Sequence, residues 1–122
     1  MNQQMADSIL FAKAKAFALR VVRLYRYLRD HKESVIAKQM LRSGTSIGAN
    51  IAESRYAQSK SDFLSKLQIA LKEAAETLYW LELLRDAKLV ENAKAFTSIC
   101  EDCTELIKLL TASVKTAKSG NR

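Results

Sequence analysis

The sequence contains no proline, and only three glycines occur among its 122 residues. Because proline and glycine are the strongest breakers of regular structure, their scarcity favours long, uninterrupted helices with few turns. The two cysteines, Cys100 and Cys103, are too few for the disulfide framework of a small secreted protein. They are expected to be reduced.

Long apolar segments are also missing. No run of about 18 apolar residues occurs, and the first twenty residues lack a cationic segment followed by an uncharged core. We therefore expect a cytoplasmic protein with no membrane partner. At 48% apolar and 27% charged residues, the composition is that of a globular domain, and the length allows one domain with one core.

Acidic residues are scarce at both ends of the chain, which carries a net charge of +7. Residues 8–30 contain a single acid, Asp30, and residues 106–122 contain none. The cations of the first region are Lys13, Lys15, Arg20, Arg23, Arg26 and Arg29. Clustered cations neutralise phosphates and give salt-dependent binding with little sequence preference, so these six residues are a candidate nucleic-acid surface. The alternative is a solvated face that keeps the protein soluble.

Two tyrosines lie in the same basic region. Exposed aromatic rings stack on bases, so Tyr27 and Tyr25 are candidates for that role. Tyr25 lies near the apolar side of the expected helix, however, and is expected to pack.

Apolar residues recur at spacings of three and four along four stretches, which predicts four amphipathic helices. The helices are expected at about residues 5–29, 34–57, 61–86 and 91–118. Short connections between helices of this length imply antiparallel neighbours. The predicted fold is therefore all-α: a single up-down-up-down antiparallel four-helix bundle.

Details of the connections follow from the same pattern. Ser34 is a candidate N-cap for the second helix, and Ser59 with Asp62 has the spacing of a capping box at the third. The fourth helix returns beside the first, which should bring Lys115 and Lys118 near Lys13 and Lys15.

Residues 41–53, LRSGTSIGANIAE, place small residues inside a helical pattern. Gly44, Gly48 and Ala52 recur every fourth residue and so share one side of the helix. Each glycine costs a helix roughly 1 kcal/mol relative to alanine, so two of them indicate a neighbour that must approach very closely. A loop is the alternative, but Ile47 and Ile51 keep helical spacing.

This stretch, together with residues 59–84, resembles the bacterial four-helix bundle family that includes the ribosomal-RNA intervening-sequence proteins and the accessory protein of diversity-generating retroelements. The residues at the family's motif positions are Ser46, Ile47, Ala49, Asn50, Ile51, Ala52, Glu53, Phe63, Ala70 and Glu76. Many members continue with Gly and then Arg, whereas Ser54 precedes Arg55 here. The resemblance is specific in the second and third helices and generic in the others.

The resemblance implies a cytoplasmic, non-enzymatic bundle that forms homo-oligomers, typically pentamers. For the retroelement relatives it also implies a positively charged surface that binds nucleic acid and a partner reverse transcriptase. It does not identify the partner of this chain.

No set of residues in the chain is typical of catalysis or of metal binding. Glu53, Glu73 and Glu76 supply carboxylates, but a ferritin-like site needs Glu-x-x-His pairs, and the one histidine, His31, falls in a predicted connection. We expect no metal and no cofactor. Glu76 should instead form hydrogen bonds with Arg42 and Asn50 that fix helix register. Cys100 and Cys103 lie on the apolar stripe of their helix and are expected in the core.

The third helix carries more apolar residues than one core needs. Tyr79 and Leu83 lie off its main stripe, and this flank is expected to face another subunit. Two functions therefore remain open: an oligomeric nucleic-acid-binding accessory protein, and a protein-interaction module or scaffold with no nucleic-acid role.

Overall fold

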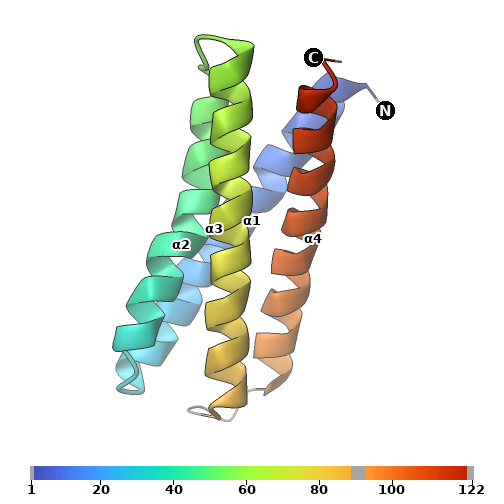
Figure 1. The fold of residues 1–122 in the computed structure, drawn as a ribbon. Helices are drawn as coiled ribbons and strands as arrows, with labels where there is room; N and C mark the ends of the chain where they lie inside the picture. Colours follow the sequence, from blue (N-terminus) through green and yellow to red (C-terminus); the bar gives the residue numbers. More distant parts are fainter. Residues whose placement is uncertain (1, 89–92, 121–122) are drawn as a thin grey trace.

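The computed structural model describes residues 2–88 and 93–120, and the described ranges contain four helices and no strand. The helices are α1 (Gln3–Asp30), α2 (Val35–Ser54), α3 (Lys60–Asp86) and α4 (Ala93–Lys118). Each runs antiparallel to the one before it, and the two ends of the chain lie at the same end of the molecule (Figure 1). The predicted all-α four-helix bundle is confirmed. The expected first residues of the fourth helix, 91 and 92, lie outside the described residues.

Capping groups determine where the first three helices begin. α1 starts two residues earlier than expected because the Asn2 side chain accepts a hydrogen bond from the Met5 amide at 2.8 Å. Ser59 caps α3 as predicted, since its Oγ accepts from the Asp62 amide at 3.0 Å, while the Asp62 carboxylate accepts from the Gln58 amide at 3.1 Å rather than from that of Ser59. Ser34 occupies the predicted N-cap position of α2, but its side chain makes no capping bond, and Glu33 accepts from the Ile36 amide at 2.8 Å instead.

The end of α2 differs from the prediction. The helix stops at Ser54, three residues before the expected end at residue 57. From Arg55 onward the backbone turns through tighter bonds to the residue three positions earlier, such as Tyr56 N to Glu53 O at 3.0 Å. The shorter helix leaves room for the turn that places Ser59 at the start of α3.

All four helices contribute to the core. The largest fully buried side chains include Val21, Leu28, Met40, Ile47, Leu67, Leu81, Phe96, Leu106 and Leu110. Both cysteines are buried as predicted, and the Cys103 thiol donates to the Ala74 carbonyl at 3.3 Å. Burial raises the pKa of Cys103 to about 12, so this thiol is a packing group rather than a nucleophile.

The small residues of α2 face two neighbours. On one side, Gly44 is buried against Val21 of α1, and Gly48 faces the Ala14 backbone of α1. On the other side, a buried hydrogen bond of 2.8 Å joins the hydroxyls of Ser43 and Thr77, linking α2 to α3. The prediction of a closely packed second helix is confirmed.

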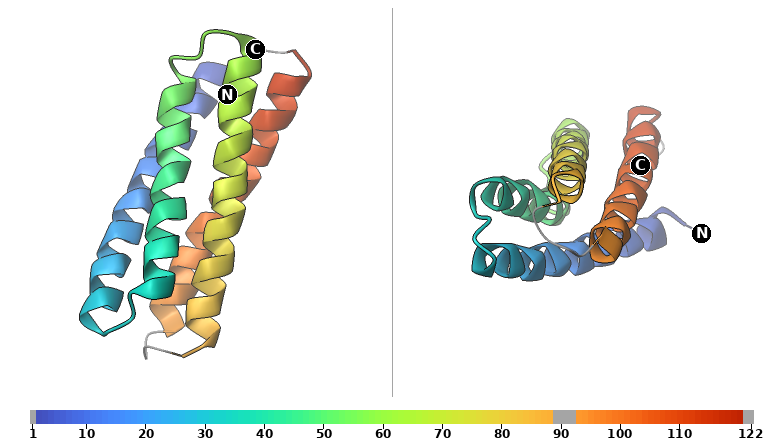
Figure 2. Two further views of the ribbon diagram at one scale, coloured as in Figure 1. Left: turned by 60° about the vertical axis from the view of Figure 1, so that its left-hand side comes forward. Right: turned by 90° about the horizontal axis from the view of Figure 1, so that it is seen from below.

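α1 is inclined to the other three helices (Figure 2). Its C-terminal half lies beside α2, and its N-terminal end passes the last turns of α4. In the described part of the chain, no helix has an apolar segment long enough to cross a membrane.

Candidate functional site

The structure divides the six predicted phosphate-binding cations of α1 into separate groups. Lys15, Arg23 and Arg26 are exposed on the outer face of the helix, and none of them forms an ion pair with a described acid. They lie along one stripe with Leu19, which is 50% exposed. We call Lys15, Arg23 and Arg26 the free cations.

Two of the other predicted cations point toward α4 and are paired there. Lys13 Nζ lies 3.0 Å from Glu105, and Arg20 Nη1 lies 2.5 Å from Asp102. Exposed ion pairs of this kind add little stability, but the acids balance the charge of both cations. Arg29 lies at the end of α1, where it pairs with Asp30 at 3.3 Å.

The prediction that the basic C-terminal end of the chain meets Lys13 and Lys15 is wrong. Lys13 pairs with Glu105, which precedes Lys115 by ten residues, or about 15 Å of helix. The last turns of α4 instead border a hollow lined by the first turns of α1, near Gln3. The inclination of α1 sets this register.

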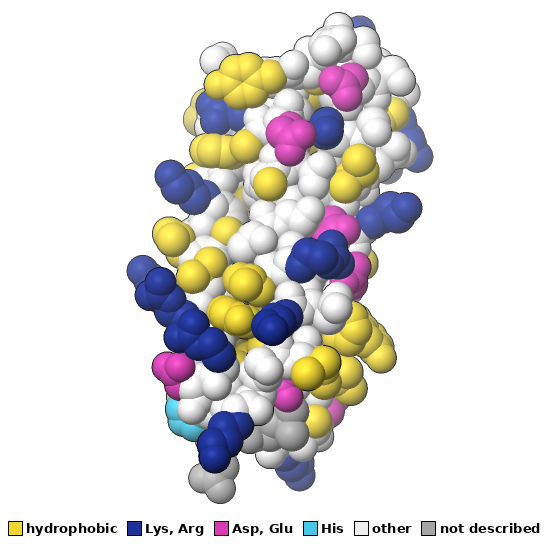
Figure 3. Space-filling view, turned by 90° about the vertical axis from the view of Figure 1, so that its left-hand side faces the viewer, with side chains coloured by type: hydrophobic (Ala, Val, Ile, Leu, Met, Phe, Trp, Pro, Cys, Tyr) yellow, Lys and Arg dark blue, Asp and Glu magenta, His cyan; other side chains and the backbone are white. Residues whose placement is uncertain are grey.

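Figure 3 shows the surface on the side of α1 and α2. Lys and Arg side chains gather along the left edge, above the single histidine, His31, which follows α1. Tyr27, one turn before His31, is 38% exposed, and the two rings lie 4.0 Å apart. Tyr25 is partly buried and packs against the core, as expected.

A polar network crosses from α2 to α3. Arg42 binds Glu73 at 3.1 Å and also binds Glu76, which accepts a further hydrogen bond of 2.8 Å from the Trp80 indole. The carboxylates are thus occupied by a guanidinium and an indole, as befits a structural rather than a metal-binding role. The predicted bond between Arg42 and Glu76 is confirmed.

Two other motif residues lie outside this network. The predicted involvement of Asn50 is wrong: its amide donates to the Ser46 carbonyl one turn earlier on the same helix, at 2.9 Å. Glu53 forms a 3.1 Å ion pair with Lys66 of α3. Ala52 is half-buried on the side of α2 that also carries Gly44 and Gly48.

Exposed apolar side chains occur on the same two helices as the network. Tyr79 is 59% exposed and packs edge-to-face on Trp80, with ring centroids 5.1 Å apart. Ile69 and Val35 are 39% and 76% exposed, and Leu83 is half-buried. Tyr79 and Leu83, the predicted interface residues, therefore lie on the outer side of α3.

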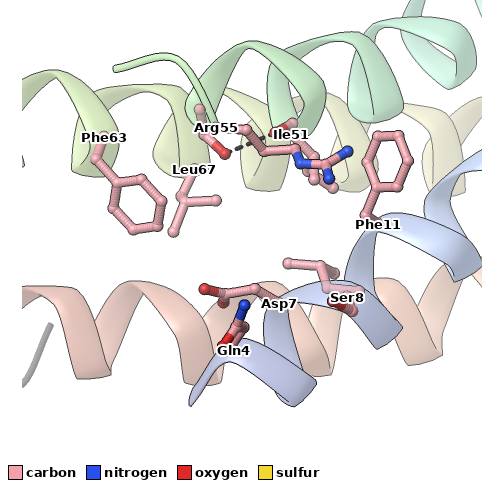
Figure 4. A pocket seen from close by; sticks show the side chains of 10 residues that line it. Gln4, Asp7, Ser8, Phe11, Ile51, Arg55, Phe63 and Leu67 are labelled. Carbon is pink, nitrogen blue, oxygen red and sulfur yellow. Dashed lines mark hydrogen bonds between the residues drawn. The ribbon is translucent and has the colours of Figure 1, made fainter. Parts of the chain in front are cut away.

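A hollow of about 370 Å³ lies where α1, the end of α2 and the start of α3 meet. The Arg55 guanidinium lies over the Phe11 ring at 4.3 Å from its centroid, with Asp7 and Gln4 on the opposite wall (Figure 4). Sequence reasoning did not find this contact. The only local signal is that Phe11 is apolar but lies off the stripe formed by Leu10 and its core neighbours.

The network predicts a specific pH dependence. The hydrogen bond from Trp80, followed by that from Arg42, holds the pKa of Glu76 below its usual value. A carboxyl with a lowered folded-state pKa stabilises the fold above its unfolded pKa, and this contribution is lost as the pH falls through the folded pKa. Glu76→Gln should therefore lose less stability than the wild type as the pH falls below about 4.5.

Urea denaturation at a series of pH values measures this effect. Trp80→Phe, which removes the indole donor, should flatten the acid dependence in the same direction. An unchanged acid slope in Glu76→Gln would show that Glu76 does not stabilise the fold in this way.

Comparison with known proteins gives a family match and a similar solved structure. The family described as "23S rRNA-intervening sequence protein" matches residues 6–112. A crystal structure from Bacteroides thetaiotaomicron VPI-5482, described as a protein with unknown function from the S23 ribosomal protein family, is 51% identical in sequence. That similarity covers 91% of this chain and 99% of the other, with a TM-score of 0.86. No curated protein matches the sequence.

Proposed function

The chain belongs to the 23S rRNA-intervening sequence protein family, and from this premise we propose that it is a non-enzymatic accessory protein of the cytoplasm that binds RNA or DNA non-specifically. The observation that carries the proposal is the stripe of free cations, Lys15, Arg23 and Arg26. They are exposed on the outer face of α1, while Glu105 and Asp102 of α4 are paired with Lys13 and Arg20.

The geometry of the stripe suits a phosphate backbone. Lys15 and Arg26 are eleven residues apart, which is about 17 Å of helix and spans about five phosphates of one strand. Flexible cations at this spacing neutralise phosphates without reading base edges, so affinity should depend strongly on salt and weakly on sequence.

Charge reversal tests this function. Arg23→Glu together with Arg26→Glu should weaken binding of a labelled oligonucleotide and lower the slope of log K against log salt by about two, because two phosphate contacts are lost. Fluorescence anisotropy at several salt concentrations measures both quantities.

The matched control is Lys38→Glu with Lys72→Glu, which changes the net charge equally at exposed positions of α2 and α3. This control should weaken binding less and preserve the slope. Equal losses in the two double variants would assign binding to net charge alone, and no loss in either would exclude the surface on α1.

The second candidate function is assembly through the outer side of α3. It is supported by the exposure of Tyr79 and Ile69 on α3 and of Val35 on α2, the two helices joined by the Arg42 network, since patches of exposed apolar surface mark interaction sites. In this proposal the flank forms a homo-oligomer, with a pentamer suggested by resemblance. The rest of the surface then docks a partner protein. The family resemblance suggests a reverse transcriptase as that partner.

A further inference from the structure

A second hollow, of about 300 Å³, lies between α1 and α4 beside the free cations. Its apolar floor is formed by Leu24 of α1 with Phe96 and Ile99 of α4. Phe96 and Ile99 are only 2% and 3% exposed, so the floor is part of the packed core and is rigid. An apolar body that entered the hollow would find a preformed surface.

The rim of this hollow is cationic and aromatic. Arg20, Arg23 and Tyr27 line it from α1. Tyr27 is held from behind by the ring of His31, whose Nδ1 lies 2.7 Å from the Tyr27 carbonyl oxygen. Asp102 neutralises Arg20 at 2.5 Å, whereas Arg23 pairs with no acid in the described part of the chain and is the rim cation open to an anion.

The combination selects for a flat group with an apolar face, attached to a negative charge. An unpaired nucleobase with its phosphate has this form. The bases of a duplex are stacked inside the double helix, which leaves only phosphates for α1 to contact. Base stacking on a protein aromatic ring tolerates every sequence, because each base has a π-face.

We propose that this hollow binds one unpaired base of a single-stranded nucleic acid, stacked on Tyr27, with its phosphate on Arg23. The proposal rests on the proposed function and adds the class of nucleic acid. The free cations hold the backbone, and the hollow distinguishes single strands from duplexes.

The test compares three fluorescein-labelled probes in anisotropy titrations at one salt concentration: single-stranded dT20, an abasic strand of the same length and charge, and a 20-base-pair duplex. The wild type should bind dT20 about 5- to 100-fold more tightly than the abasic strand, as expected for one stacked base. Tyr27→Ala should abolish most of this preference, and Tyr27→Phe should retain it. Tyr56→Ala removes a tyrosine that is 86% exposed in the turn after α2 and should change nothing.

The outcomes distinguish nucleic-acid binding as such from binding of a base in the hollow. If no probe binds, the proposed function itself is wrong. If all three probes bind and the abasic strand or the duplex matches dT20 in affinity, the protein binds nucleic acid but the hollow does not bind a base. A preference for dT20 that survives in Tyr27→Ala would also overturn the inference, because stacking would then occur elsewhere.

Discussion

Replacing Gly44 with alanine should lower the free energy of unfolding by about 1–3 kcal/mol, although alanine is the better helix former. A Cβ atom at this position would lie 2.8 and 2.9 Å from the two methyl carbons of Val21 and 3.3 Å from its Cβ. Valine is stiff at χ1, so Val21 cannot rotate away, and α1 would have to move from α2.

Gly48→Ala is the matched control on the same face of the same helix. Its added Cβ would lie 3.6 Å from the Ala14 carbonyl oxygen, which is an ordinary contact. Removing a helical glycine should therefore stabilise the protein by up to about 1 kcal/mol. Urea denaturation followed by circular dichroism distinguishes the opposite signs.

A double variant identifies the cause of the Gly44 effect. Val21→Ala alone removes buried methyl groups and should destabilise the fold, but combined with Gly44→Ala it should cost less than the two single changes together. Additive costs would show that Val21 is not the obstacle. A Gly44→Ala protein as stable as the wild type would show a looser contact between α1 and α2.

The two glycines also show which parts of the helix packing could be predicted from the sequence alone. Their spacing correctly predicted one close-packed side of α2, because helical periodicity is a local property. The spacing could not show that Gly44 lies against the side chain of Val21 while Gly48 lies against the backbone of Ala14, because those contacts depend on the register of α1 against α2. The N-caps show the same limit. The capping bond of Ser59 could be predicted from its neighbours in sequence, whereas at α2 the side chain of Glu33, and not that of Ser34, accepts the capping bond.

Less of the candidate site than of the fold could be predicted from the sequence, because the site depends on contacts between residues that are far apart in the chain. Charge and periodicity placed six cations on α1, but Glu105 lies 92 residues from Lys13 and Asp102 lies 82 residues from Arg20. Only the packing of α4 shows that these two cations are paired, whereas Lys15, Arg23 and Arg26 form no ion pair with an acid in residues 2–88 or 93–120. The hollow beside Tyr27 could not be predicted from local sequence either, because its floor combines Leu24 of α1 with Phe96 and Ile99 of α4.

In the proposed homo-oligomer, Leu83→Asp should disrupt assembly and leave a monomer of 13.7 kDa in light scattering. Leu83 and Tyr79 lie on the outer side of α3, and an aspartate enclosed in an apolar interface would be an unpaired buried charge. Because the flank is largely apolar, the wild-type oligomer should survive high salt, whereas nucleic-acid binding should not.

The control for assembly is Leu19→Asp, which places the same charge on a leucine that is 50% exposed on the outer face of α1. It should leave the oligomer intact. Leu83 is half-buried, so its replacement could also unfold the protein. Tyr79→Asp therefore provides a second test at a position that is 59% exposed. Far-UV circular dichroism verifies that each variant is helical. If both α3 variants remain oligomeric, the flank is not the interface. If Leu19→Asp alone dissociates the protein, assembly uses α1, and subunit contacts would then compete with nucleic acid for the same surface.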